Sequence, residues 1–152
     1  MTKNRAELKV MVIRDHDDKC SVVATIHAGA FSGCGRAWLD ANDLFKFATS
    51  VDRISSTSTG EATLSGGYLN SDGKPDLTVH VQLKPHGARG HIAIVAELAS
   101  EPPASNAIMP FVARASGALI VEPSALHQFA QRLLNIPRGT EMETVVSGES
   151  AI

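Results

Sequence analysis

The chain has 152 residues, 43% of them hydrophobic, which predicts one globular domain with a core that needs no disulfide bridges. Its 14 basic and 16 acidic residues leave a formal net charge of −2, so the composition gives no support for nucleic-acid binding. No apolar run reaches the roughly 18 residues that span a bilayer, and none resembles a signal peptide. We therefore expect a cytoplasmic protein with no membrane partner.

The chain begins with a predicted β-hairpin. Residues 6–14 and 20–28 are rich in valine and isoleucine and partly alternate with polar residues, as strands do. A polar turn joins them and carries Asp15, Asp17 and Asp18. This acidic turn can meet a basic partner, so we include its three carboxylates among the predicted partner-binding residues.

A glycine-rich segment then leads into a third strand and a helix. Residues 29–35 lack the lysine and hydroxyl residue of a phosphate-binding loop, so we interpret the glycines as backbone freedom at a bend between strands. Along the strand at 34–39, Arg36 and Trp38 share one side. The helix follows Asp40, ends near residue 54, and has an apolar stripe formed by Leu44, Phe47, Ala48 and Val51.

The second half of the chain predicts four more strands and a second helix. The strands are expected at 61–65, 77–83, 91–98 and in the bent segment 107–121, with Gly66 and Gly67 ending or bulging the first. Turn residues at 70–75 and prolines in 101–106 separate them. The second helix begins at Pro123 and stops before Pro137.

The two helices and the strands before them resemble one another. Leu39 to Ala48 recurs loosely as Val121 to Ala130, and the offset is constant, since 121 − 39 and 129 − 47 both give 82. We expect an internal duplication with the order β-β-β-α-β-β-β-β-α. The predicted fold is α+β, with two layers: a curved, mainly antiparallel sheet and two helices on one face. Residues 1–137 form this domain, and 138–152 form a loose tail.

One strand suggests an exposed polar face. Leu77, Val79, Val81 and Leu83 alternate with polar residues and should face the helices. His80 and Gln82 then point away from them, and we predict that they bind a partner. Trp38 is left open between a position at the edge of the core and a binding anchor.

No motif specifies a reaction, a metal or a cofactor. The six histidines lack the spacing of metal-binding motifs, although His86 and His91 could approach one another across a hairpin. Cys20 and Cys34 are expected to be reduced, and neither has a base that the sequence places beside it. We therefore predict no catalytic residue, no metal ligand and no cofactor.

Several short motifs resemble a family of small bacterial proteins, some of which are grouped as WapI-type immunity proteins that accompany contact-dependent toxins. The matching motifs are Phe31-Ser32-Gly33, Gly35, Trp38, Leu44 with Phe47, Gly60 to Leu64, Gly90-His91-Ile92, and Leu126 with Phe129 and Leu133. The resemblance spans residues 6–136 and departs from the pattern at 106–117, where Pro110 intervenes. It implies a cytosolic protein that binds and neutralises a toxin domain, and it assigns no functional residues.

The sequence thus favours a non-catalytic protein-binding domain, of which an immunity-type protein is the specific form. The alternative is a small-molecule or metal-dependent enzyme in which His80, His86 and His91 converge on a site on the sheet. A homodimer that pairs through an open sheet edge is a third possibility.

Overall fold

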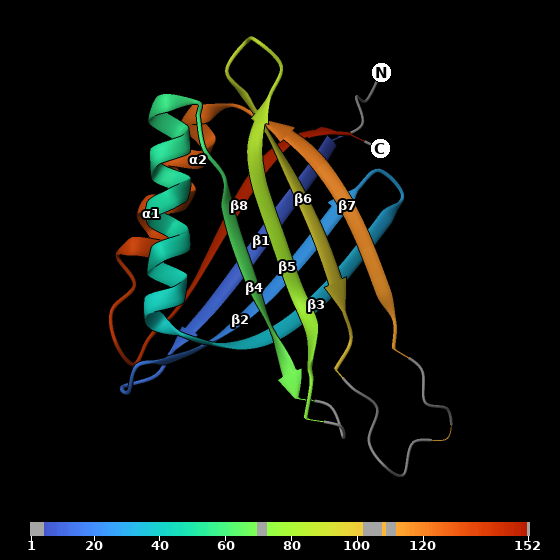
Figure 1. The fold of residues 1–152 in the computed structure, drawn as a ribbon, viewed down its shortest axis with the longest axis vertical. Coiled ribbons are helices and arrows are strands. Elements are labelled where there is room, and N and C mark those ends of the chain that lie inside the picture. The colour runs from blue at the N-terminus through green and yellow to red at the C-terminus, as the bar shows by residue number, and fades with distance from the viewer. Residues whose placement is uncertain (1–4, 70–72, 102–107, 109–111, 152) are drawn as a thin grey trace.

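The computed structural model describes residues 5–69, 73–101, 108 and 112–151, and within them the chain forms eight strands and two helices (Figure 1). The bounds are β1 Arg5–Arg14, β2 Lys19–Ala28, β3 Phe31–Asp40, α1 Ala41–Thr57, β4 Ala62–Leu69, β5 Pro75–His86, β6 His91–Ala99, β7 Arg114–Val121, α2 Pro123–Leu134 and β8 Glu141–Ser150. The predicted element order is confirmed, and an eighth strand follows it. Parts of the predicted turn at 70–75, the proline loop and segment 107–121 lie outside the described residues.

Strand pairing closes the sheet into a barrel, where we expected an open, curved sheet. Each strand pairs antiparallel with the next, and β8 returns to pair with β1. Two seams are short: β3 meets β4 only at Trp38 and Gly67, and β7 meets β8 at only two positions. The barrel therefore consists of two four-stranded groups, β8-β1-β2-β3 and β4-β5-β6-β7, which cross one another in Figure 1.

The prediction of a loose tail at 138–152 is wrong, because residues 141–150 form β8. This strand pairs with β1 from Ile13 opposite Glu141 to Arg5 opposite Glu149. It buries few large side chains, Thr144 and Val146 among them, and so lacks a strong hydrophobic pattern. A strand pairs through its backbone. β8 therefore pairs with the N–H and C=O groups at the edge of β1, which would otherwise be open.

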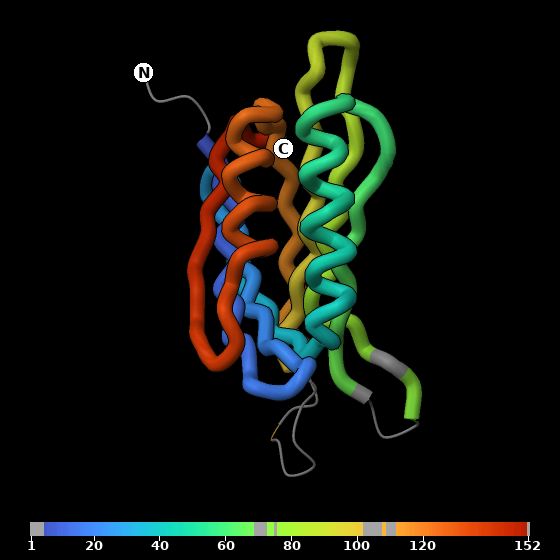
Figure 2. Tube along the Cα trace, turned by 90° about the vertical axis from the view of Figure 1, so that its left-hand side faces the viewer, coloured from blue at the N-terminus to red at the C-terminus, as the bar shows by residue number. Residues whose placement is uncertain are grey.

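The two helices lie side by side on one side of the barrel, between β4 and β8 (Figure 2). Their predicted apolar stripes are buried against the core, with Phe47 in α1 and Phe129 in α2 almost fully covered. Asp52 of α1 accepts hydrogen bonds from His127 and Gln131 of α2, at 2.9 and 3.4 Å. The helices therefore cover the side on which the two strand groups diverge.

No helix in the described part of the chain has both the length and the apolar character needed to cross a membrane.

On the opposite side the strand groups come into direct contact through β3. A Cβ on Gly35 would lie 2.2 Å from the backbone oxygen of Thr78, and one on Gly33 would lie 2.3 Å from Cβ of Ala115. Only glycine leaves room for this approach. The glycines of segment 29–35 therefore serve two purposes, since Gly29 turns the chain at φ 64° and those in β3 allow close crossing.

A β-bulge interrupts the alternation that was predicted for β5. Gly66 pairs with Val79 and Gly67 with Leu77, so Thr78 has no opposite residue on β4. Thr78 is buried, and its hydroxyl donates a hydrogen bond to the backbone oxygen of Arg36 on β3. Leu77, which was expected to face the core, is instead 47% exposed.

Replacing Gly35 with alanine should destabilise the fold. The added methyl collides with the backbone of β5, and overpacking of this kind costs about 1–3 kcal/mol. Urea denaturation would measure the free energy of unfolding, with Ser32→Ala, an exposed change on the same strand, as the control. Equal stabilities for the two variants would contradict the close crossing.

Candidate binding surface

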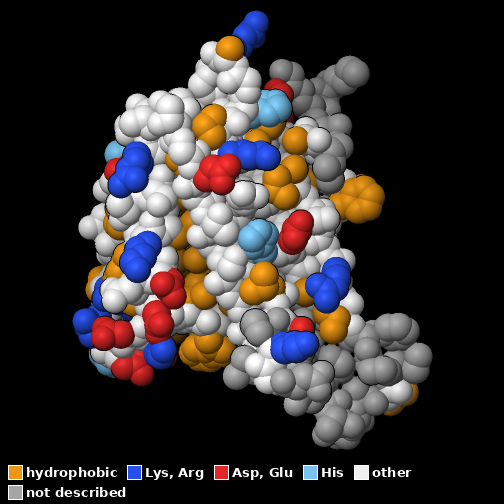
Figure 3. Space-filling view, in the orientation of Figure 1, with side chains coloured by type: hydrophobic (Ala, Val, Ile, Leu, Met, Phe, Trp, Pro, Cys, Tyr) orange, Lys and Arg blue, Asp and Glu red, His pale blue; other side chains and the backbone are white. Residues whose placement is uncertain are grey.

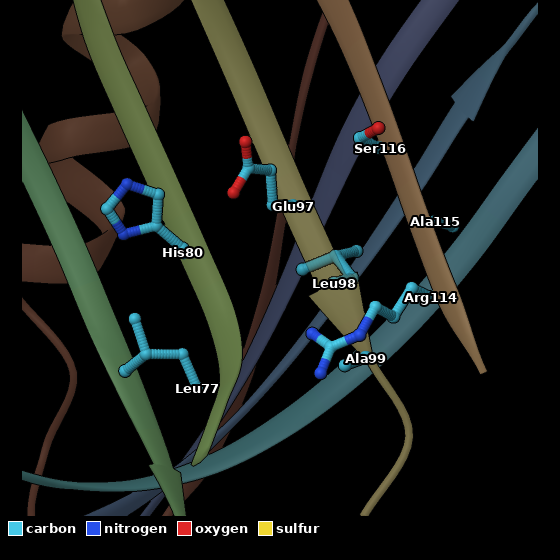
Figure 4. Close-up of a pocket in the computed structure, with 8 residues that line it drawn as sticks. All are labelled: Leu77, His80, Glu97, Leu98, Ala99, Arg114, Ala115 and Ser116. Atoms are coloured by element: carbon cyan, nitrogen blue, oxygen red, sulfur yellow. The ribbon is translucent and has the colours of Figure 1, made fainter. Parts of the chain in front are cut away.

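The outer face of β5, β6 and β7 carries a shallow pocket with a volume of about 340 Å³. The helices lie elsewhere on the barrel, so no helix covers this face (Figure 1). Figure 4 shows the lining residues, which are Leu77, His80, Glu97, Leu98, Ala99, Arg114, Ala115 and Ser116.

Strand register places three polar residues of the pocket in one row with Ser65 of the adjoining strand β4. Ser65 is opposite His80, His80 is opposite Glu97, and Glu97 is opposite Ser116. The hydroxyl of Ser65 lies 2.7 Å from Nδ1 of His80 in a hydrogen bond that orients the imidazole. Nε2 of His80 is therefore the ring nitrogen that can contact a ligand.

A second row, nearer the end of the barrel, is more apolar. Ala99 is opposite Arg114 on β7, and Leu77 lies on β5 beyond Val79, the first β5 residue that pairs with β6. In Figure 4, Leu77 and the guanidinium of Arg114 lie on either side of the pocket, below His80 and Glu97. The pocket thus combines an imidazole, a carboxylate and a guanidinium with apolar surface.

Trp38 extends the apolar surface across the seam between β3 and β4. It is 54% exposed and pairs with Gly67, which pairs in turn with Leu77. Gly67 thus lies between Trp38 and Leu77, and a Cβ on it would collide with the backbone oxygen of Asp76 at 1.9 Å. Trp38 therefore lies on the surface and not in the core.

The arrangement suits an apolar side chain held within a polar rim. Protein interfaces combine an apolar centre with polar groups that fix orientation, and tryptophan is enriched among the residues that dominate binding energy. Figure 3 shows acidic, basic, histidine and hydrophobic side chains interspersed on this face.

The structure separates the predicted partner-binding residues into two places. His80 lines the pocket, and Gln82 shares its outward face but lies one row farther along, opposite Thr63 and Val95. The acidic turn lies between β1 and β2, away from this face. There, Asp17 accepts a hydrogen bond from the amide of Lys19 at 3.0 Å.

The acidic turn is also partly neutralised by the segment that precedes β8. Asp18 forms an ion pair with Arg138 at 3.2 Å, and the same guanidinium donates to the backbone oxygen of His16 at 3.1 Å. The amide of Asp15 donates to the carbonyl of Lys19, which closes the turn. These contacts give the acidic residues a structural role in holding the turn.

Sequence reasoning missed most of the pocket. Strand pairing brings Glu97 and Arg114 into one pocket with His80 and sets Ser65 beside His80, and no local pattern reveals this pairing. Leu77 was assigned to the wrong face, and the Gly66-Gly67 pair was the one signal that a bulge could reverse it.

The histidines do not converge on a common site. His86 and His91 are cross-strand neighbours, as the hairpin predicted. They line a different depression, of about 530 Å³, together with Glu122 and Glu149, whereas His80 belongs to the pocket described above. Among the described residues, no group of three or more histidine, cysteine or acidic side chains is placed to hold a metal ion.

A scan of protein-family models and searches of curated proteins and solved structures find no match for this chain.

Cys20 and Cys34 are both free thiols in different environments. Burial raises the pKa of Cys20 to about 11, and its Sγ contacts the backbone oxygen of Leu39 at 3.6 Å. Cys34 is exposed and lies opposite Thr25, far along the hairpin from Cys20.

A thiol-specific reagent at pH 8 should therefore titrate Cys34 quickly and Cys20 slowly, because the thiolate is the reacting form. In denaturant both should react. Cys34→Ala should remove the fast phase alone, and two fast thiols in the native protein would contradict the buried position of Cys20.

Proposed function

We propose that this protein is a non-catalytic protein-binding domain that contacts its partner through the outer face of β4–β7 and the adjoining Trp38. The observation that carries the proposal is the exposed apolar pair of Trp38 and Leu77 beside the pocket. Large apolar side chains on a surface, rimmed by polar groups, mark interaction sites in soluble proteins. The uncovered sheet face gives a partner direct access to them.

The specific form of this proposal is an immunity-type protein that neutralises a toxin domain in the cytoplasm. The resemblance of Phe31-Ser32-Gly33 and Trp38 to motifs of WapI-type immunity proteins supports it. Two of the matching glycines, Gly33 and Gly35, occupy the close crossing of β3. The close crossing therefore accounts for these two glycines, and the exposed side chains would determine which partner binds.

We also infer that the two halves of the chain derive from an internal duplication. In support, the order β-β-β-α-β occurs twice, first in β1–β4 with α1 and then in β5–β8 with α2. The helices end up adjacent, each beside the last strand of its own half, as a two-fold relation would place them.

Trp38→Ala should weaken partner binding without unfolding the protein. Truncation of a tryptophan anchor typically costs 2 kcal/mol or more, which is a loss of affinity of about thirtyfold. Native mass spectrometry after incubation with lysate of the source cells would identify a bound protein, and titration with that protein would give the Kd.

Phe31→Ala is the matched control, because Phe31 is a 70% exposed aromatic residue at the other end of the same strand. If both variants bind as the wild type does, the proposed face is not the contact surface. If the captured partner arrests growth when expressed alone, co-expression with wild-type protein should restore growth and the Trp38 variant should not. Unrelieved arrest would exclude the immunity role.

A further inference from the structure

The outer face of the strand group β8-β1-β2-β3 is a second surface, distinct from the face that carries the pocket. In Figure 2 this group forms the left-hand part of the barrel, and neither helix lies beyond it. Alternate residues of its strands face the core, and the residues between them point outward. Strand register arranges the outward side chains in rows from β8 to β3, of which three successive ones are Ser147, Glu7, His27 and Ser32; Val145, Lys9, Thr25 and Cys34; and Glu143, Met11, Val23 and Arg36.

The centre of this face is apolar. Met11 and Val23 lie opposite one another on β1 and β2, and both are partly exposed. Val145 on β8 is a diagonal neighbour of Met11 and is 41% exposed. Apolar side chains that adjoin on a surface and are rimmed by polar groups mark interaction sites. This face therefore has the character of a contact surface.

The charged groups on the face follow a fixed order. The row with Met11 and Val23 begins with the exposed Glu143 on β8 and ends with the exposed Arg36 on β3. In the row of Ser147, Glu7 on β1 lies opposite His27 on β2. Both rows thus carry the acidic group on the β8 side and the basic group or imidazole on the β3 side.

We propose that this face forms a symmetric homodimer, in which a second copy of the chain packs face to face on it. An isologous contact requires a surface that is complementary to itself. A two-fold axis between the copies, parallel to the strands and midway between β1 and β2, exchanges β8 with β3 and β1 with β2. Glu143 then lies over Arg36 of the second copy, Glu7 lies over its His27, and the apolar centres of the two copies meet.

The third row is compatible with the same axis. Val145 lies over Cys34 of the second copy, and Lys9 lies over its Thr25. No residue of the three rows therefore meets one of like charge. Strands related in this way can keep within about 30° of one another, as they do when two sheets pack in the aligned manner.

A two-fold axis across the strands is a poorer solution. If it passes between two rows, it places Lys9 over Met11 of the second copy and Glu143 over its Val145, so that charged groups lose water against apolar ones. If it passes through a row, it sets Glu143 or Lys9 against its own copy, which is a like-charge contact. The order of charges therefore selects the axis along the strands.

A second copy is favoured as the occupant by charge and by area. Glu7 and Glu143 are balanced by Lys9 and Arg36, so these rows have no net charge that would select an acidic or a basic partner. Four strands of ten residues, about 4.8 Å apart and rising about 3.3 Å per residue, offer roughly 600 Å² of footprint. That is comparable with the roughly 800 Å² of accessible surface that each partner buries in a stable complex.

The dimer goes beyond the proposed function, because it uses the other strand group and has only Trp38, beside β4, at its margin. The purified protein alone tests it, whether or not a toxin or another partner exists. Sedimentation equilibrium of the wild type should show a dimer whose fraction rises with protein concentration.

Charge reversal tests the pairing across the axis. Glu143→Arg and Arg36→Glu should each raise the dimer Kd by about tenfold or more, because each variant sets like charges against one another twice in the dimer. The double variant with both changes should return the Kd to that of the wild type, since opposite charges face one another again. Glu61→Arg is the matched control, because Glu61 is exposed beside α1 and away from this face, and it should leave the Kd unchanged.

A cross-link gives an independent readout. Val145→Cys places a thiol over the native Cys34 of the second copy, and oxidised glutathione, which accepts the two electrons, should join the pair in a disulfide that survives on a non-reducing gel. Within one copy these positions are three strands apart, about 14 Å, which is too far for a disulfide. Ser147→Cys, at the next outward position of β8, should cross-link more slowly, and adding Cys34→Ala to Val145→Cys should abolish the cross-link.

The native thiol reports on the same contact without any substitution. At concentrations where the protein is monomeric, Cys34 should react with a thiol reagent as quickly as its exposure predicts. As the concentration rises and the dimer forms, that reaction should slow, because Val145 of the second copy covers the thiol.

Four results would overturn the dimer: a wild type that remains monomeric at every concentration, single charge reversals that dimerise as the wild type does, a folded double variant that stays monomeric, or no cross-link through Val145→Cys. Urea denaturation of each variant would show that it is folded, so that a lost dimer is not mistaken for an unfolded chain.

Discussion

The structure depends on how closely β3 can cross β5, β6 and β7. Two packed sheets normally lie about 10 Å apart, with side chains filling the space between them. Here glycines at 33 and 35 let the backbone of β3 approach Thr78 and Ala115 directly. With the two strand groups in contact on this side, they diverge on the other, and the core between them needs a cover. The two helices provide that cover with their apolar stripes.

Much of the fold could be predicted from the sequence, and part of it could not. Both helices have an apolar stripe over several turns, and most strands have valine- and isoleucine-rich patterns, so their order was predictable. Closure of the sheet was not, because it depends on pairs such as Arg5 with Glu149, which are distant in sequence. β8 was missed since its contribution is a backbone ladder with few buried side chains.

The candidate site illustrates the same limit at the level of single residues. The alternation correctly predicted that His80 and Gln82 point outward. The bulge at Thr78, however, places the side chain of its neighbour Leu77 on the opposite face from the one predicted. A single extra residue changes the face of everything beyond it, because side chains alternate with a period of two. The acidic turn was predicted to meet a basic partner, but its pairing with Arg138 could not be predicted because Arg138 comes from a distant segment of the chain.

Closure of the barrel by β8 also has a consequence for how the chain folds. The ladder between β1 and β8 joins residues at nearly opposite ends of the sequence, so it contributes heavily to the contact order, and high contact order slows folding. Until β8 arrives, β1 presents an open edge whose alternate residues Leu8, Val10 and Val12 are apolar. Such an edge is prone to pair with other chains. A strand with only two buried residues is thus the one that protects this edge from aggregation.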